Sequence, residues 1–405
     1  MRNYTAPLKD MKFVLKDLLN IEQRYQGYSK FADKVSMDIL EQYLEVAADF
    51  CQNELLPINA TGDQQGCRLD NGVVTTPDGF KEAYQKYVEL GFTSLTGDEN
   101  YGGQGFPTLY RIAISEIITA TNWSWGMYPG LSHGAMRTLE HRGNNEQKQK
   151  FLVPLIAGQW TGTMCLTESH AGSDLGLIRT KAVPNDDGSY NISGEKIFIS
   201  AGEHDLAENI VHIVLARLPD APAGTKGISL FIVPKFNLDQ AGNIAERNGV
   251  ICSSIEHKMG IHGNATCVLN FENAKGFLIG PENRGLNCMF TFMNSARIGT
   301  AIQGLATAES SYQGALAYAK DRLAMRSLEG AQAPNLPADP IIVHPAVRNM
   351  LLTQKVFAEG SRSLAYYLAT YADISEASED ANEKKAADDR LALLTPIAKA
   401  LMTET

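Results

Sequence analysis

The hydrophobic pattern changes its period twice along the 405-residue chain, and this constrains the fold more than any other feature. Residues 11–160 carry apolar side chains three and four positions apart, which is typical of amphipathic helices. From about Gly158, short runs rich in Ile, Val and Phe alternate with Gly, Asp, Asn and Pro, as in antiparallel strands. The helical spacing returns near Gly285. We therefore predict an α+β fold with a helical domain (1–160), an antiparallel β domain (161–284) and a C-terminal helical domain (285–405).

Local signals predict several connections. Thr61–Gly79 is rich in Gly and Asp and should be a loop, and Asp186–Ser189 should form a tight hairpin turn. Asn294–Lys320 is a long helix candidate. Arg326–Pro340 contains three prolines and is predicted to be a loop or insertion before the next helix.

Composition excludes some classes of protein. The net charge of −10 argues against a general nucleic-acid binder, because phosphate backbones favour a basic face. The six cysteines show no C-x-x-C spacing, so we interpret them as reduced residues of a cytoplasmic protein and predict no metal site. Neither a signal peptide nor a stretch of roughly eighteen apolar residues is evident.

Two short segments carry the chemical signal. Met164–Asp174 leads a strand-like run into a hydroxyl-rich turn, and Lys196–Ser200 repeats the theme on a second strand. Backbone N–H groups and hydroxyls beside Gly172 can reach a flat polar ring or phosphates without a bulky side chain intervening. In this order and spacing, the segments resemble the flavin-binding segments of the acyl-CoA dehydrogenase family. The supporting motifs are Tyr101–Gly105, Glu146–Pro154, Glu256–Ile261 and Thr266–Cys267.

This resemblance runs from about residue 35 to the end and implies FAD as the cofactor. It is strongest to a long subgroup that includes the methylthiopropanoyl-CoA dehydrogenases, through the extra segment Phe13–Leu19, the Lys196–Ser200 form and the insertion Asn335–Pro340. The FAD-binding positions that it implies are Met164, Leu166, Thr167, Gly172, Ser173, Phe198, Ile199, Ser200 and Arg322. Many relatives carry Trp where this chain has Phe198, which keeps a π-face and loses the indole N–H. An ordinary hairpin with a Gly turn is the alternative.

For the substrate, the resemblance implies that Ser173, Asn294 and Arg297 contact coenzyme A. The family often has Asp at the position of Asn294, so an acceptor is kept and a charge is lost. A surface arginine is the alternative for Arg297, and a cation favourable to a helix C-terminus is the alternative for Arg322.

The catalytic residue is unknown from the sequence. Most members of the family carry a Glu base in an I-Y-E-G-T motif near the C-terminus, and this motif does not occur here. Some relatives place the Glu one residue before the helix arginine, where this chain has Ala296. We expect either that the C-terminal domain is incomplete and the Glu lies beyond residue 405, or that the chain is a base-less relative.

The resulting hypothesis is an FAD-dependent acyl-CoA dehydrogenase of fatty acid metabolism that forms a trans-2-enoyl-CoA and passes electrons to an electron-transferring flavoprotein. The acyl group stays open between 3-(methylthio)propanoyl and a fatty acyl chain, and a homodimer is expected by resemblance. The alternatives are an acyl-CoA oxidase and an inactive binding relative. Gly130–Gly134 matches a G-x-S-x-G nucleophile elbow but lies in a helical context, and His204 and His257 are expected to be core or surface groups.

Overall fold

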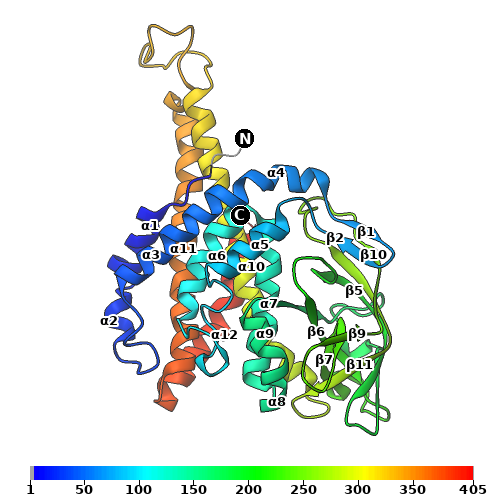
Figure 1. Ribbon diagram of the computed structural model, residues 1–405. Helices are drawn as coiled ribbons and strands as arrows, with labels where there is room; N and C mark the ends of the chain where they lie inside the picture. The colour runs from blue at the N-terminus through cyan, green and yellow to red at the C-terminus, as the bar shows by residue number, and fades with distance from the viewer. Residues whose placement is uncertain (1–3, 405) are drawn as a thin grey trace. The chain divides into compact units, whose positions relative to one another are not determined.

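The computed structural model describes residues 4–404, which divide into two compact units. The first, here called the helical unit, comprises residues 4–56, Pro107–Asn122 and residues 297–404. The second, here called the sheet unit, comprises Pro57–Phe106 and Trp123–Ala296. Figure 1 labels most elements of both. Each unit is built from segments far apart in sequence, so both depend on contacts that local patterns do not reveal.

The helical unit begins with short helices and ends with long ones. Its elements are α1 (Leu8–Phe13), a π-helical segment (Val14–Leu18), α2 (Ile21–Tyr25), α3 (Met37–Phe50), a second π-helical segment (Cys51–Leu55), α6 (Thr108–Thr121), the later part of α10 (Gly285–Asp321), α11 (Pro345–Ala377) and α12 (Ala381–Glu404). At the start of α3 the Ser36 hydroxyl accepts a hydrogen bond from the Ile39 N–H, which caps the helix. Met37, Leu40 and Leu44 then bury one face of α3 at helical spacing.

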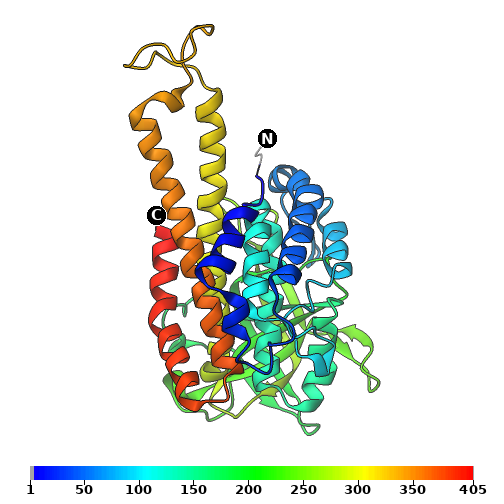
Figure 2. The same cartoon turned by 90° about the vertical axis from the view of Figure 1, so that its left-hand side faces the viewer.

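The later turns of α10 and the first turns of α11 form a helical hairpin (Figures 1 and 2). Residues 322–344 connect the two helices at its tip, which confirms the predicted loop at Arg326–Pro340. Asp339, buried in this loop, accepts hydrogen bonds from the N–H groups of Ser327 (2.9 Å), Gln332 (3.0 Å) and Ala333 (2.7 Å). The Arg326 guanidinium adds a further contact at 3.2 Å. One carboxylate therefore organises the tip of the hairpin.

A buried charged cluster joins three helices of the helical unit. Arg362 on α11 donates through Nε to Glu116 of α6 at 2.8 Å and through Nη2 to Glu309 of α10 at 2.8 Å. The Tyr366 hydroxyl donates to the other oxygen of Glu116 at 2.6 Å. The Arg362 side chain is fully enclosed. Buried charges are tolerated only when they are paired and hydrogen-bonded, so this cluster fixes the relative register of α6, α10 and α11.

The sheet unit combines a seven-stranded sheet with helices and small hairpins. Its helices are α4 (Leu56–Gln65), α5 (Phe80–Glu89), α7 (Trp123–Arg142), α8 (Asn145–Gln147), α9 (Val153–Ile156) and the start of α10. Its strands are β1 (Arg68–Asp70), β2 (Val73–Thr75), β3 (Trp160–Cys165), β4 (Lys181–Pro184), β5 (Tyr190–Ser200), β6 (Asn209–Arg217), β7 (Ile228–Pro234), β8 (Phe236–Leu238), β9 (Ile244–Arg247), β10 (Val250–Ile255) and β11 (Thr266–Ile279).

The large sheet has the order β10-β11-β5-β4-β6-β3, and β7 pairs with both β11 and β6. The sheet therefore closes on itself through β7 in the manner of a small barrel. Most pairs are antiparallel, as predicted, and the turn between β4 and β5 lies where expected. The exceptions are β3, which runs parallel to β6, and β4, which meets β6 in parallel at Lys181 and Arg217. Local sequence patterns do not indicate which strand will pair with β3. Parallel pairing joins strands that are separated by a long crossover connection, so the partner is distant in the sequence.

The sheet has apolar side chains on both faces. One cluster includes Ile192, Val214, Phe231 and Leu269, and a second includes Ile213, Leu230 and residues of α7 and α9. The strands β6 and β7 are buried at nearly every position, which is typical of strands covered on both sides. This packing holds the ends of β3 and β5 in place.

The loop prediction for Thr61–Gly79 is wrong in part. Helix α4 continues to Gln65, and the hairpin of β1 and β2 follows. A Cβ at Gly62 would lie 2.5 Å from the Phe80 ring, so this buried glycine serves helix packing instead of a turn. Among residues 4–404, no helix is long and apolar enough to cross a membrane.

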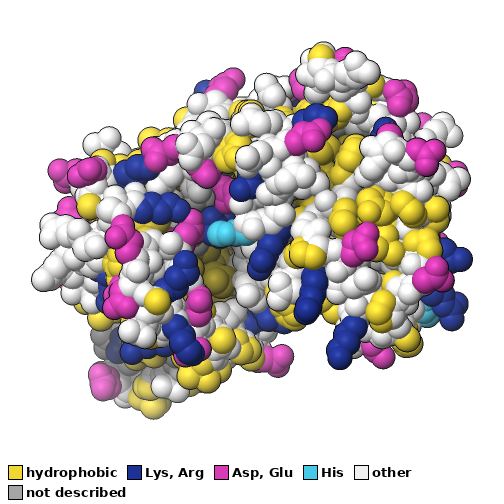
Figure 3. Space-filling model, turned by 90° about the horizontal axis from the view of Figure 1, so that it is seen from below, with side chains coloured by type: hydrophobic (Ala, Val, Ile, Leu, Met, Phe, Trp, Pro, Cys, Tyr) yellow, Lys and Arg dark blue, Asp and Glu magenta, His cyan; other side chains and the backbone are white. Residues whose placement is uncertain are grey.

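Side chains of both charges lie on the face drawn in Figure 3. Lys and Arg side chains are interspersed there with Asp, Glu and hydrophobic side chains. With a net charge of −10, electrostatic attraction for an anionic ligand must come from individual basic groups.

Candidate functional site

Strand β5 ends in a β-bulge that turns Phe198 outward. Ile199 pairs with Cys267 and Lys196 with Leu269, so Ile197 and Phe198 lie opposite one residue of β11. Phe198 has φ of 58°, and the residue is 59% exposed. A bulky residue in this left-handed region costs about 1–3 kcal/mol, and such strain gathers at functional sites. Bulges commonly redirect side chains next to active sites, and this one presents an aromatic face.

The two motif segments lie side by side. The Ile197 N–H donates to the Thr167 carbonyl at 2.9 Å, which joins β5 to the segment after β3. Beyond Thr167, Glu168 and Ala171 exchange two backbone hydrogen bonds of 2.9 and 3.0 Å around a tight turn. The structure therefore brings the segment Leu166–Ser173 next to the end of β5 that carries Phe198–Ser200.

Several polar groups of these segments remain available. Within residues 4–404, the Thr167 N–H and the hydroxyls of Thr167, Ser173 and Ser200 have no hydrogen-bond partner. Gly172 and Ser173 are exposed. A Cβ at Gly172 would meet only the Thr167 methyl at 3.7 Å, an ordinary contact, so packing within the protein does not require glycine there. The open backbone suits the close approach of a ligand.

Behind these segments lies a buried ion pair. Lys196 is fully buried, and its ammonium group donates to Glu168 at 2.9 Å and to the Leu166 carbonyl at 2.9 Å. Glu168 also accepts from the N–H groups of Arg179 (2.6 Å) and Thr180 (3.0 Å) and from the Thr180 hydroxyl (2.6 Å). Burial alone would raise the pKa of Glu168, but Lys196 and these donors hold that pKa below its usual value. Glu168 is therefore ionised, and both of its oxygens accept hydrogen bonds. Burial lowers the pKa of Lys196, and the neighbouring Glu168 counteracts that shift.

Sequence reasoning assigned no role to Glu168 or Lys196, although both lie in the quoted motifs. A signal for Lys196 was present, because it shares the inward-facing parity of Ile192 on β5. A lysine at a core position demands a buried partner. The identity of that partner, 28 residues away, depends on the fold.

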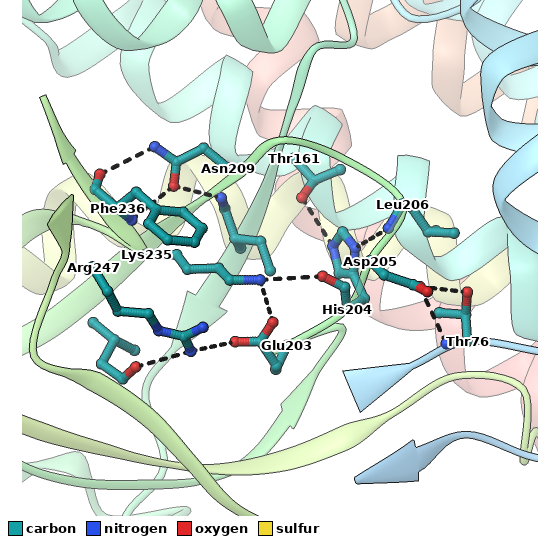
Figure 4. A network of polar contacts seen from close by, with 12 residues as sticks. Thr76, Thr161, Glu203, His204, Asp205, Leu206, Asn209, Lys235, Phe236 and Arg247 are labelled. Carbon is teal, nitrogen blue, oxygen red and sulfur yellow. Dashed lines mark hydrogen bonds and ion pairs between the residues drawn. The ribbon is translucent and has the colours of Figure 1, made fainter. Parts of the chain in front are cut away.

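A second polar network in the sheet unit surrounds Glu203 (Figure 4). Lys235 donates to the Glu203 carboxylate and, at 3.3 Å, to the His204 carbonyl. Arg247 donates to the other oxygen of Glu203 at 2.8 Å. This network links the segment after β5 to Lys235, which lies between β7 and β8, and to β9. It contains none of the predicted ligand-binding residues.

His204 is a satisfied core residue, as expected. The Leu206 N–H donates to its Nδ1 at 3.2 Å, so Nε2 carries the proton and donates to Thr161 at 2.9 Å. Burial lowers the pKa of His204 to about 3, which keeps the ring neutral. Asp205 accepts from the N–H and hydroxyl of Thr76. These contacts favour a structural role for His204 over acid–base catalysis, and His257 is exposed.

The G-x-S-x-G sequence does not form a nucleophile elbow. Gly130–Gly134 lies within helix α7, and Ser132 is buried. Its hydroxyl donates to the Tyr128 carbonyl at 3.0 Å and accepts from the Gly162 N–H at 3.1 Å. The serine joins α7 to β3 and is not presented at a strand-to-helix turn.

The remaining predicted positions lie on α10 or next to it. Asn294 is exposed, Arg297 is half-buried three residues later, and Arg322 is exposed immediately after the helix ends. Met164 is half-buried on β3 and packs against the apolar cluster that includes Ile213. Ala296 offers no group that accepts a proton. The roles of these residues remain predictions.

Three sequence profiles match the chain in order. The acyl-CoA dehydrogenase N-terminal domain matches residues 38–159, the middle domain 163–274 and the C-terminal domain 283–388. The chain belongs to the acyl-CoA dehydrogenase family, a family of FAD-dependent oxidoreductases. The exposed Phe198 face, the open Gly172 backbone and the unpartnered donors of Thr167, Ser173 and Ser200 fit this cofactor.

Individual relatives agree with this membership. A 3-methylmercaptopropionyl-CoA dehydrogenase of Ruegeria pomeroyi is 43% identical over 99% of this chain and 67% of its own length. The chain thus spans about two thirds of that relative. The butyryl-CoA dehydrogenase structure from Megasphaera elsdenii matches with a TM-score of 0.69 and 27% identity over 91% of this chain and 88% of its own. An acyl-CoA dehydrogenase of Bacillus anthracis, complexed with FAD, shares the fold with a TM-score of 0.72 and 23% identity over 92% of this chain and 58% of its own.

Proposed function

We propose that this protein catalyses the α,β-dehydrogenation of an acyl-CoA thioester to the trans-2-enoyl-CoA. The observation that carries the proposal is the pairing of Leu166–Ser173 with the Phe198 bulge, within a chain of this family. When bound, FAD supplies the two-electron acceptor for the oxidation. The protein supplies binding, orientation and exclusion of water.

The chain's own residues would divide this work. The Thr167 N–H and hydroxyl and the Ser200 hydroxyl are donors for the polar edge of the flavin ring, and Phe198 offers a packing surface. Gly172 and Ser173 suit a phosphate because their backbone is exposed. Met164, Leu166 and Ile199 would complete the apolar surroundings. Arg322 is proposed to contact FAD across a homodimer interface.

For coenzyme A, we propose contacts from Ser173, Asn294 and Arg297. A guanidinium is well matched to a phosphate-bearing ligand. We assign no catalytic base, because Ala296 stands where some relatives carry Glu. The three-domain division at residues 160 and 284 and a cytoplasmic location also stay predictions.

The proposed acyl group is 3-(methylthio)propanoyl, supported by the 43% identical relative. A butanoyl group is the second candidate, supported by the Megasphaera elsdenii structure. Electron-transferring flavoprotein is the proposed electron acceptor. An acyl-CoA oxidase or an inactive flavin-binding relative is the alternative.

The test is an anaerobic titration of the purified protein with 3-(methylthio)propanoyl-CoA, butanoyl-CoA and longer acyl-CoA thioesters, followed by visible absorption. Bleaching of the flavin band by one thioester supports the proposal and ranks the substrates. Oxygen consumption without an added acceptor would favour the oxidase. A flavin band that no thioester bleaches would contradict catalysis by this chain.

A further inference from the structure

The peptide group between Leu166 and Thr167 accepts a hydrogen bond from a buried lysine. Its carbonyl accepts from the buried Lys196 ammonium at 2.9 Å, and its N–H, on Thr167, has no partner among residues 4–404. A hydrogen bond to one end of a peptide polarises the group and strengthens the donor at the other end. Lys196 therefore makes the Thr167 N–H a better donor toward a ligand.

Glu168 completes the arrangement. It neutralises Lys196 at 2.9 Å and accepts three further hydrogen bonds from Arg179 and Thr180, just before β4. The carboxylate thus ties the segment after β3 to both β4 and β5. Because both members of the pair are buried, a shift of this segment would leave one charge without its partner.

We propose that Lys196 and Glu168 are positioning residues for the flavin: they orient and polarise the Leu166–Thr167 peptide so that the Thr167 N–H binds the electron-rich edge of the ring. This deepens the proposed function and rests on its cofactor assignment. Lys196 and Glu168 do not touch the flavin themselves. An N–H donor strengthened in this way favours the reduced, more negative flavin.

The sheet unit contains a matched control. Lys235 is also buried, donates to a buried glutamate, Glu203, and donates to a backbone carbonyl, that of His204 (Figure 4). Glu203 retains Arg247 when Lys235 is removed, as Glu168 retains Thr180 and Arg179. The Lys235 network differs from that of Lys196 in that it includes no proposed ligand-binding residue.

The experiment compares wild type, Lys196→Met, Lys196→Met/Glu168→Gln and Lys235→Met. Each protein is stripped of FAD, and its melting temperature is measured as apoprotein. FAD is then titrated back by flavin fluorescence, and the midpoint potential of bound FAD is measured without substrate. Loss of the hydrogen bond from the Lys196 ammonium group to the Leu166 carbonyl is expected to raise the FAD Kd by about tenfold or more.

We expect Lys196→Met to raise the FAD Kd by at least about tenfold and to shift the potential to more negative values, with Lys235→Met within about threefold of wild type. The double variant should regain part of the lost melting temperature, because it removes the unpaired carboxylate, and should still bind FAD weakly. A double variant that binds FAD like wild type, or equal weakening by Lys235→Met, would overturn the proposal.

The two proposals fail separately. If the wild-type protein binds FAD but no thioester bleaches the flavin, the proposed dehydrogenation is contradicted. The FAD titrations still test the positioning role of Lys196 and Glu168. A wild-type protein that binds no FAD overturns both.

Discussion

Two buried cations, one in each unit, are enclosed in different ways. Lys196 of the sheet unit meets one carboxylate and one backbone carbonyl, and the neighbouring Phe198 is exposed. Arg362 of the helical unit meets two carboxylates, Glu116 and Glu309, and all three side chains are buried. The Lys196 pair therefore lies next to groups that a ligand can reach, whereas the Arg362 cluster is enclosed between helices.

The difference separates two uses of buried charge. A buried ion pair seldom stabilises a fold more than apolar residues would, but removing one partner costs several kcal/mol. In the helical unit, this cost holds α6, α10 and α11 in one packing arrangement. In the sheet unit, it restrains a short segment whose remaining donors are proposed to bind the cofactor. We expect mutations at Arg362 to reduce mainly the stability of the fold and mutations at Lys196 to reduce mainly the affinity for the ligand.

The largest effect should come from Arg362→Met. This change leaves Glu116 and Glu309 buried and close together without a cation, so we expect a loss of about 3–5 kcal/mol in the free energy of unfolding. Urea titration measures it. The control is Lys385→Met, which removes an exposed pair with Asp389 and should cost less than about 0.5 kcal/mol. A similar loss of unfolding free energy in Arg362→Met and Lys385→Met would show that the buried cluster is no more important for stability than an exposed ion pair.

A smaller effect, dependent on pH, is expected at Asp373. Burial raises the pKa of this carboxyl to about 6, although Tyr25 and the N–H groups of Thr108 and Leu109 donate to it. The raised pKa means that the folded state binds the proton more tightly than the unfolded state. This contribution is fully present below about pH 4 and is lost as the pH rises through about 6, by roughly 3 kcal/mol.

Asp373→Asn removes this titration. Urea unfolding of wild type and variant from pH 4 to 7.5 should give a stability difference in favour of wild type that shrinks as the pH rises. Parallel curves across this range would show that Asp373 titrates alike in the folded and unfolded states.

The smallest effect on stability is expected at Phe198. Glycine relieves the left-handed φ of 58°, whereas alanine does not, so Phe198→Gly should be more stable than Phe198→Ala by about 1 kcal/mol. Both variants lose the aromatic face and should bind FAD more weakly than wild type. Thermal unfolding of the apoproteins and an FAD titration test the two parts. Equal stability of the variants would contradict backbone strain at the bulge.

The sequence predicted features whose causes are local. The order of helical and strand regions, the turn at Asp186–Ser189 and the proline-containing loop follow from periodicity and turn residues. The parallel pairing of β3 with β6 was not predictable, because register between distant strands is set by the assembled core. Gly62 signalled a loop but makes room for Phe80 within a helix.

The candidate site shows the same limit. The motifs predicted which segments form it, but not that Phe198 adopts a left-handed conformation, which a bulky aromatic residue rarely does. The burial of Lys196 had a signal in strand parity, whereas its contact with Glu168 depended on how the strands pair.

The carboxylate at the tip of the helical hairpin has a consequence for proteolysis. Proteases cleave segments that can leave their native hydrogen bonds, and exposed loop tips are their usual targets. Residues 322–344 look vulnerable, yet three backbone N–H groups are held by Asp339, and these bonds help lower its pKa to about 2. Because Asp339 stays ionised at neutral pH, trypsin should cut slowly after Arg326. Asp339→Asn should turn this tip into an early cleavage site.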